Sequence, residues 1–350
     1  MKRALEFVLL GTIIAFTFLY LASIGWFFNS KPNSTKVNIS PTPLAAVEKK
    51  TSFTIAGDVM LDRLINHKFK SDFTAILSDF DGGIFQKADL RILNLEGPIS
   101  DGPIIDDVAV DNLVFNFPPE SMDFLKFLNL NAVSLANNHS LNAGESGHQN
   151  TLKVLNEAGI IGIGTQNKVG PGSAKQFNTP LPLSVLAINL LDDDPAELVP
   201  YIEEEGKRGN FIFVFPHWGN EYAFEHNSYQ EKAAKQWIVA GADLIIGSHP
   251  HVIQDAQIIN GVPVIYSLGN FVFDQTFSRE TQQGLVISGV LEKEKISLTF
   301  LPTEQIHLKP SLISGSEKSR IVGKIIEGVK EESEIITEDT VIIKRKGGDV

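Results

Sequence analysis

Residues 211–222 read FIFVFPHWGNEY, an unbroken apolar run that leads into a proline and a histidine. The run Phe211–Phe215 consists only of β-branched and aromatic residues, which favours a buried β-strand. His217 follows at the carboxyl end of this expected strand, and open α/β sheets bind their ligands at that end. The stretch therefore predicts an α/β domain that carries polar chemistry at its strand ends.

Seven more β-rich runs alternate with segments of helical period, which is typical of a layered α/β domain. The other predicted strands are Ser52–Ala56, Leu90–Leu93, Ala132–Leu135, Leu183–Ile188, Leu244–Ile246, Val262–Tyr266 and Leu285–Leu291. The predicted helices are Leu61–Lys70, Glu120–Leu128, Glu145–Ala158, Ala196–Lys207 and Tyr229–Ala240. Polar motifs come directly after these strands, so we expect them to converge at one site.

The composition limits the chemistry of this site. The 350 residues include 42 acidic and 30 basic ones, a net charge of −12, which argues against nucleic acid as a partner because phosphate binding needs a basic face. The chain has no cysteine, which excludes disulfides, thiolate nucleophiles and thiolate metal sites. Catalysis or binding must therefore use oxygen and nitrogen groups, with a metal ion or a few cations to meet any anionic partner.

The N-terminal segment indicates a membrane protein. Residues 5–28 (LEFVLLGTIIAFTFLYLASIGWFF) are long enough to cross a bilayer as a helix, and the basic pair Lys2-Arg3 favours a cytoplasmic start. We predict an uncleaved single-pass anchor in residues 1–28, with a cleaved signal peptide as the alternative; either places the domain on the extracytoplasmic side. Residues 29–50 read as a flexible linker, 51–313 as the folded domain, and 314–350 as a helix at Lys318–Val329 and a peripheral charged tail.

The first two motifs each contain a carboxylate that has either a structural or a functional interpretation. Asp58 follows the strand at 52–56 and is either the cap of the next helix or a rigidly held metal ligand. Glu96, in the motif that begins at Asn94, is either an ordinary loop residue beside Gly97 or a second ligand. The neighbouring motifs must decide between these readings.

The remaining motifs supply amides and imidazoles. Asn137, Asn138 and His139 follow one strand; the amides are able to cap a helix, whereas we assign His139 a chemical role. In His249-Pro250-His251 the proline restricts the backbone, so both rings are able to face one ion. Asn270 either shapes the pocket floor or sits in a structural loop. No chemical role is expected for His67, His148, His226 and His307.

Together these groups suit a divalent metal, since carboxylate, amide oxygen and imidazole are ligands for Mn²⁺, Zn²⁺, Fe or Mg²⁺. The set is large for one ion, so one or two ions are expected, and two ions need a bridging carboxylate, which we assign to Glu96. His139, if it lies outside the coordination sphere, is placed to protonate a leaving oxygen or stabilise charge. The sequence contains no Gly-x-Ser-x-Gly, His-Glu-x-x-His or phosphate-binding Gly-rich motif.

Six motifs stand in the order seen in the CapA family of poly-γ-glutamate capsule synthesis proteins, also called PgsA, which the chain resembles from about residue 53 to 273. They are Gly57–Leu61, Asn94–Glu96, Leu135–His139, His217–Tyr222, Gly247–Val252 and Tyr266–Phe271. The family is similar to calcineurin-like metallophosphoesterases, which implies a four-layer αββα sandwich. The resemblance implies a catalytic His139 and the metal ligands Asp58, Glu96, Asn138, His217, His249 and His251. The rest of the pocket is expected to include Asn94, Asn137, Trp218, Glu221 and Asn270.

The chain also departs from the metallophosphoesterase pattern. Met60 occupies the place of the histidine in the first Asp-x-His motif, so one ion lacks a ligand, and Asp62 and Asn142 replace a common glycine and aspartate of the family. Three functions follow as hypotheses: a metal-dependent phosphoesterase, an accessory component of capsule assembly that binds an anionic polymer or membrane subunits, and a plain binding module. The resemblance favours poly-γ-glutamate biosynthesis or export, with the catalytic step open.

Overall fold

The computed structural model describes residues 49–101 and 113–345. The predicted anchor at residues 5–28 and nearly all of the linker at 29–50 lie outside the described residues. Within the described part, no helix has the length and apolar character needed to span a bilayer.

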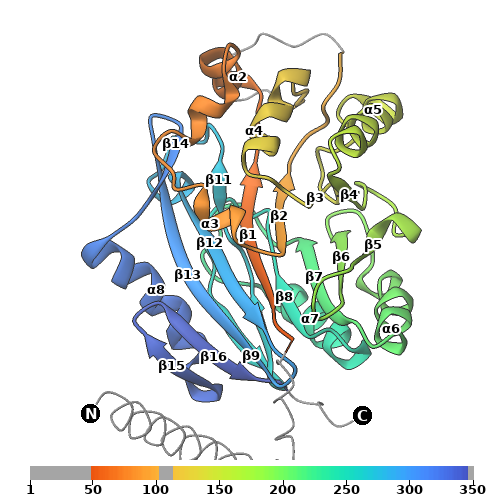
Figure 1. The fold of residues 1–350 in the computed structure, drawn as a ribbon, viewed down its shortest axis with the longest axis vertical. Coiled ribbons are helices and arrows are strands. Elements are labelled where there is room, and N and C mark those ends of the chain that lie inside the picture. The colour runs from red at the N-terminus through yellow and green to blue at the C-terminus, as the bar shows by residue number, and fades with distance from the viewer. Residues whose placement is uncertain (1–48, 102–112, 346–350) are drawn as a thin grey trace, which may run out of the picture. The chain divides into compact units, whose positions relative to one another are not determined.

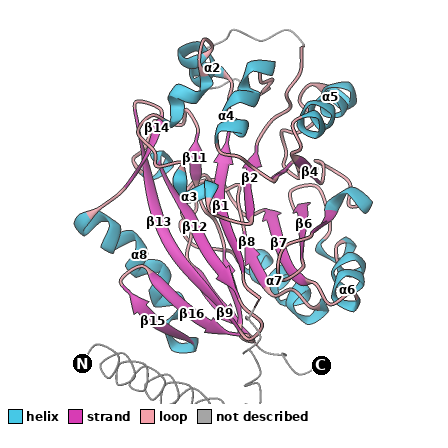
Figure 2. Cartoon of the chain, viewed as in Figure 1, coloured by secondary structure: helices cyan, strands magenta, loops and turns pink. Residues whose placement is uncertain are grey.

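The larger sheet has ten strands, most of which are labelled in Figures 1 and 2. Its main strand order is β15-β16-β13-β12-β1-β2-β3-β4, with β11 paired to β1 and β14 to β13. The strands β1 to β4 run parallel, while β12, β13, β16 and β15 are antiparallel. The bounds are β1 Thr51–Val59, β2 Leu90–Leu95, β3 Ala132–Ser134, β4 Ile161–Ile163, β11 Asn270–Val272, β12 Gln283–Leu291, β13 Lys295–Ile306, β14 Lys309–Leu312, β15 Ser333–Thr337 and β16 Thr340–Lys344.

The smaller sheet has the order β5-β6-β7-β8-β10-β9. Its four central strands are parallel, and the two edge strands β5 and β9 are antiparallel to their neighbours. The bounds are β5 Ala174–Phe177, β6 Leu183–Asn189, β7 Phe211–His217, β8 Leu244–Ile246, β9 Ala256–Ile259 and β10 Val262–Ile265. All seven residues of β7 are buried, as its continuous apolar sequence predicts.

The two sheets pack face to face as an α/β sandwich. One apolar cluster joins them, with Phe53 and Ile92 from the larger sheet and Val185 and Phe213 from the smaller. A second cluster packs α2, α4 and α5 against the larger sheet, and a third packs α6 and α7 against the smaller. The helix bounds are α2 Arg63–Phe69, α3 Gly83–Gln86, α4 Met122–Phe127, α5 Gly144–Glu157, α6 Val199–Lys207, α7 Ser228–Ala240 and α8 Gly315–Val329.

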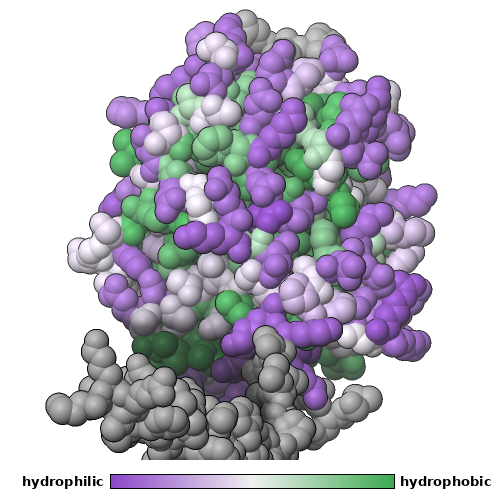
Figure 3. Space-filling model, in the orientation of Figure 1, coloured by the Kyte–Doolittle hydropathy of each residue, from purple (hydrophilic) through white to green (hydrophobic). Residues whose placement is uncertain are grey.

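Each of the eight predicted strands and six predicted helices overlaps an observed element, which confirms the α/β fold class. Most apolar side chains are buried between the layers. Accordingly, Figure 3 shows a mainly hydrophilic face on which apolar residues appear in small groups. The prediction of a peripheral C-terminal tail is wrong for β16, whereas most residues of β15 are exposed. α8 packs into the cluster between the sheets through Ile321 and Ile325, and β16 pairs with β13 and buries Val341 and Ile343 in that cluster.

Candidate metal centre

The polar motifs converge where the parallel strands of both sheets end. Asp58 lies in β1 and pairs in register with Asn94 of β2 and Asn270 of β11. Glu96 follows β2, and its backbone N–H donates to the carbonyl of Val59 at 2.8 Å. The smaller sheet adds residues from the loops after β7 and β8, because its strand ends face the same site.

Two glycines allow the chain to reach this geometry. A Cβ on Gly57, next to Asp58, would lie 2.0 Å from the carbonyl oxygen of Gly269. A Cβ on Gly247, two residues before His249, would lie 2.2 Å from the indole nitrogen of Trp218. Only glycine fits such close backbone approaches, so both positions keep the ligand-bearing loops tight against their neighbours.

The first candidate metal group is Asp58, Glu96 and His251. Each offers one ligand atom, and these three atoms lie within 4.8 Å of one another. His251 Nδ1 is 3.3 Å from Asp58 Oδ2, and His251 Nε2 is 3.5 Å from Glu96 Oε1. The amide of Asn94 donates to Asp58 Oδ1 at 2.8 Å and to Glu96 Oε2 at 3.2 Å, which orients both carboxylates. All of these side chains are buried.

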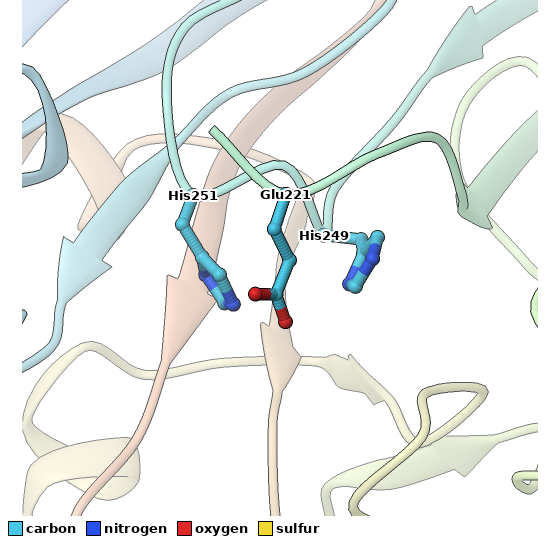
Figure 4. A group of neighbouring side chains, drawn as sticks. All are labelled: Glu221, His249 and His251. Atoms are coloured by element: carbon cyan, nitrogen blue, oxygen red, sulfur yellow. The ribbon is translucent and has the colours of Figure 1, made fainter. Parts of the chain in front are cut away.

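The second candidate group is Glu221, His249 and His251, whose ligand atoms also lie within 4.8 Å of one another. Figure 4 shows the Glu221 carboxylate between the two imidazoles. Both histidines have left-handed backbone angles, with φ of 100° at His249 and 56° at His251. Such strain in non-glycine residues is typical of functional sites, where the surrounding structure holds the backbone in place.

Two unsatisfied atoms indicate that these groups fit a cation. Glu96 Oε1 and His249 Nδ1 are buried, and within the described residues neither has a hydrogen-bond partner. Buried polar atoms without a partner are rare in proteins because each costs about 1–3 kcal/mol. A divalent ion bound in the group of each atom would satisfy it, and the oxygen and nitrogen chemistry suits Mn²⁺, Zn²⁺, Fe or Mg²⁺. The residue common to the two groups is His251, so the geometry does not make Glu96 a bridge between two ions.

The charges in the site favour bound protons when no cation is present. Burial raises the pKa of Glu96 well above its usual range, although His251 opposes the shift. Burial alone would lower the pKa of His251, but the nearby Glu96 and Asp58 carboxylates raise it to about 9. Because a metal must displace a proton from such a cluster, its affinity is expected to fall in acid.

His139 lies at the edge of the site and lines a cavity of about 170 Å³ with His251 and Glu221. Its Nδ1 is 3.0 Å from Asn142 Oδ1, an acceptor, so Nδ1 carries the hydrogen and Nε2 has the lone pair. Nε2 lies 3.9 Å from Glu96 Oε1. Burial lowers the pKa of His139 to about 4, so the ring is neutral near pH 7 and able to accept a proton.

His217 and Asn138, two expected ligands, belong to neither candidate group. His217 Nε2 is 2.9 Å from Asn138 Oδ1, and its Nδ1 is 3.2 Å from the hydroxyl of Ser248. Their role as ligands therefore stays a prediction. Asn137 supports the network by donating to Asn94 Oδ1 at 3.0 Å.

Trp218 does not line the pocket, contrary to expectation. Its indole is fully buried, stacks on Trp237 and Tyr266, and donates to the Tyr266 carbonyl at 2.8 Å. The tryptophan belongs to the apolar cluster between the smaller sheet and α7. Its place directly after His217 follows strand alternation, which turns successive side chains to opposite faces.

The cavity wall also contains residues that were not among the predicted site residues. Arg63 and Asp274 form a buried ion pair on its wall, and the Arg63 guanidinium lies 4.9 Å from the Phe115 ring centre. Tyr222 and Gln275 complete the mouth. In the sequence, Arg63 closely follows the first motif and Gln275 closely follows the last. This proximity to the motifs was the indication that both residues belong to the site.

Comparisons with known proteins identify the family. The family model described as "Bacterial capsule synthesis protein PGA_cap" matches residues 52–275, a range that contains every candidate ligand. The chain therefore belongs to this family, which confirms the CapA resemblance and its relation to metallophosphoesterases.

Three relatives show the extent of this similarity. The PGA biosynthesis protein CapA of Bacillus subtilis is 29% identical over 261 residues, covering 67% of this chain and 66% of the relative. The capsule biosynthesis protein CapA of Bacillus anthracis is 26% identical over 300 residues, covering 78% and 72%. A probable polyglutamine synthesis accessory protein of Mycobacterium tuberculosis is 26% identical over 215 residues, covering 53% and 56%. The chain thus spans just under two thirds of the B. subtilis relative.

Proposed function

We propose that this protein is a membrane-anchored, extracytoplasmic component of capsule or poly-γ-glutamate biosynthesis or export that holds a divalent metal ion. Family membership and the names of the relatives support the capsule role. The observation that carries the metal is the pair of buried, unpartnered atoms, Glu96 Oε1 and His249 Nδ1, within the two candidate groups. Residues 5–28 supply the proposed anchor.

Different residues of such a site would bind the ion and transfer protons. Asp58, Glu96 and His251 would hold the ion, with His217 and Asn138 as proposed further ligands in the four-layer metallophosphoesterase arrangement. A bound divalent ion polarises a substrate oxygen and lowers the pKa of coordinated water. His139 has an unprotonated Nε2, which accepts from the Asn138 amide at 3.2 Å. In turnover this neutral imidazole would give up that bond, take a proton from an attacking water or hydroxyl and return it to a leaving oxygen.

A second function, metal-dependent binding of an anionic polymer or of membrane subunits without turnover, is favoured by Met60. This side chain is fully buried in the apolar cluster under α2 and α4, where a phosphoesterase would carry a ligand. A cation held by Glu96 and its neighbours would let a protein of net charge −12 contact an acidic chain.

One experiment separates the two functions. The full chain is purified in mild detergent, its metal content is measured by elemental analysis, and hydrolysis of bis-p-nitrophenyl phosphate is followed with added Mn²⁺. A phosphoesterase shows stoichiometric metal and turnover that disappears in His139→Ala and Asp58→Asn but persists in the control His67→Ala, which changes an exposed residue of α2. Metal without turnover supports the binding function, and absence of metal from the purified protein refutes both.

A further inference from the structure

Glu221 is an unusual member of its candidate group because it is exposed and lies in a loop, whereas His249 and His251 are buried. A long side chain in such a loop loses rotamer freedom when it binds an ion, unless other groups already hold it. The structure contains groups that can hold it: a series of hydrogen bonds runs from His251 to Tyr222, the residue that follows Glu221 in the chain.

The series begins at Asn270, whose orientation is fixed by its partners. Its amide nitrogen donates to Gln275 Oε1 at 3.0 Å and to the carbonyl of Thr281 at 2.9 Å, both of which only accept. Asn270 Oδ1 must therefore face His251 Nδ1, 3.0 Å away, and accept its hydrogen. Nε2, the nitrogen that faces Glu96, is then the atom through which an ion would bind after displacing its proton.

The series continues through Gln275 and Tyr222. Because Gln275 Oε1 accepts from Asn270, its nitrogen is the donor to the Tyr222 hydroxyl at 3.2 Å. The hydroxyl oxygen thus accepts, which leaves its own hydrogen free to turn toward the carboxylate of the adjacent Glu221. Burial, and after it the charge of Glu221, raises the pKa of Tyr222. All the bonds run in one direction, so they reinforce one another.

Tyr222 is itself held in a demanding backbone conformation. Its φ of 63° is rare for a bulky residue, and its backbone N–H donates to the carbonyl of Pro250 at 2.8 Å, between the two histidines. Its ring meets Phe277 edge-on, with ring centres 5.1 Å apart. The loop that carries Glu221 is therefore tied to the loop that carries His249 and His251 before any ion is present.

We propose that Glu221 is a metal ligand together with His249 and His251, and that Asn270, Gln275 and Tyr222 are positioning residues that hold it in place. The inference rests on the metal site of the proposed function. Outer residues that orient metal ligands contribute about 10- to 100-fold to affinity. Loss of the ligand itself is expected to cost more than loss of either positioning residue.

Mn²⁺ binding to the full chain in detergent tests this arrangement, measured by calorimetry and by the electron paramagnetic resonance spectrum of the bound ion. We expect Glu221→Gln to weaken binding by at least about 100-fold and Tyr222→Phe and Gln275→Ala by about 10-fold. Glu221→Gln is also expected to change the spectrum of any ion still bound. The matched controls, Glu225→Gln and Tyr229→Phe, change exposed residues nearby and keep wild-type affinity.

The outcomes separate this inference from the proposed function. A wild-type protein that binds no Mn²⁺ refutes the proposed metal site. A wild-type protein that binds Mn²⁺ while Glu221→Gln binds it within twofold leaves that site standing and overturns Glu221 as a ligand. Weak binding by Glu221→Gln with unchanged binding by Tyr222→Phe and Gln275→Ala overturns the positioning role. If Glu221→Gln does not fold, Glu221→Asp, which keeps the charge and shortens the reach, gives the same comparison.

Discussion

His139 should make the metal-free protein sensitive to mild acid. Burial lowers the pKa of this histidine to about 4 in the folded state, whereas an unfolded chain keeps a value near 6.5. Below pH 6.5 the unfolded state therefore binds more protons than the folded state. The contribution of His139 to stability is present above about pH 6.5 and is lost as the pH falls toward 4.

The magnitude follows from this pKa difference. Between pH 7.5 and pH 4.5 a shift from 6.5 to about 4 costs the folded state about 2.5 kcal/mol. The variant His139→Gln has no group to titrate, so it avoids this loss. At pH 7.5 the variant should have a lower free energy of unfolding than wild type, because it loses the contacts with Asn142 and Phe115. This difference between variant and wild type should shrink by about 2 kcal/mol at pH 4.5.

Urea unfolding in excess EDTA measures this difference, with fluorescence of the buried Trp218 and Trp237 as the probe. The exposed His67→Gln serves as control and should stay within about 0.5 kcal/mol of wild type at both pH values. A deficit of His139→Gln that is the same at pH 7.5 and 4.5 would show that the ring is not held neutral by burial, and the argument for a basic Nε2 would fail with it.

Three further predictions concern the ion and the fold. Mn²⁺ at 100 times its Kd should add about 2.7 kcal/mol to the free energy of unfolding of the wild type, which raises the Tm of a domain of this size by about 4 °C, and it should have no effect on Asp58→Asn. Gly57→Ala should cost about 1–3 kcal/mol in urea unfolding, since its Cβ would lie 2.0 Å from the Gly269 carbonyl; an unchanged midpoint would contradict that close approach. Ile343→Ala should cost about 2–5 kcal/mol because the side chain is buried between the sheets, and a cost below 1 kcal/mol would mean that β16 is peripheral after all.

The sequence predicts which residues lie at the ends of the strands, but it does not predict which loops of the two sheets come into contact. Asp58 lies at the end of β1 and Glu96 follows the neighbouring strand β2, and parallel strands place their carboxyl ends at one edge, so the meeting of these two carboxylates could be expected. His251 joins them from the smaller sheet, in the loop after β8. The contact between the sheets could not be expected, because it depends on which faces pack together. Glu221 shows this limit: its place beside His249 depends on the bond from Tyr222 to Pro250, a contact between two loops.

The C-terminal segment shows a second limit. Residues 330–345 are rich in charge, which suggested a solvated tail, but Val341 and Ile343 alternate with outward residues and close one side of the sandwich. This period-two pattern is only five residues long in β16, too short to outweigh the charges around it. β16 lies between β15 and β13 and gains stability from pairing with both, which its own sequence does not specify.

The position of Met60 bears on how many ions the site holds. A histidine here would restore the metallophosphoesterase motif in sequence, but Met60 is fully buried among the apolar side chains under α2 and α4, and its sulfur accepts from the backbone N–H of Asp62 at 3.1 Å. The core around it is apolar and closely packed. An imidazole in its place would lie among these side chains rather than among the ligands.

We therefore expect Met60→His to lower the free energy of unfolding by about 1–3 kcal/mol, because a buried polar ring is left without a partner. The number of Mn²⁺ ions bound per chain should not increase, as measured by elemental analysis after gel filtration. Met60→Leu keeps the volume and the apolar character, so it should cost less than about 1.5 kcal/mol and leave metal content unchanged. A second ion bound by Met60→His would contradict this expectation. It would mean that the new imidazole reaches the ligands, and that the single residue Met60, not the apolar packing around it, prevents a two-ion site.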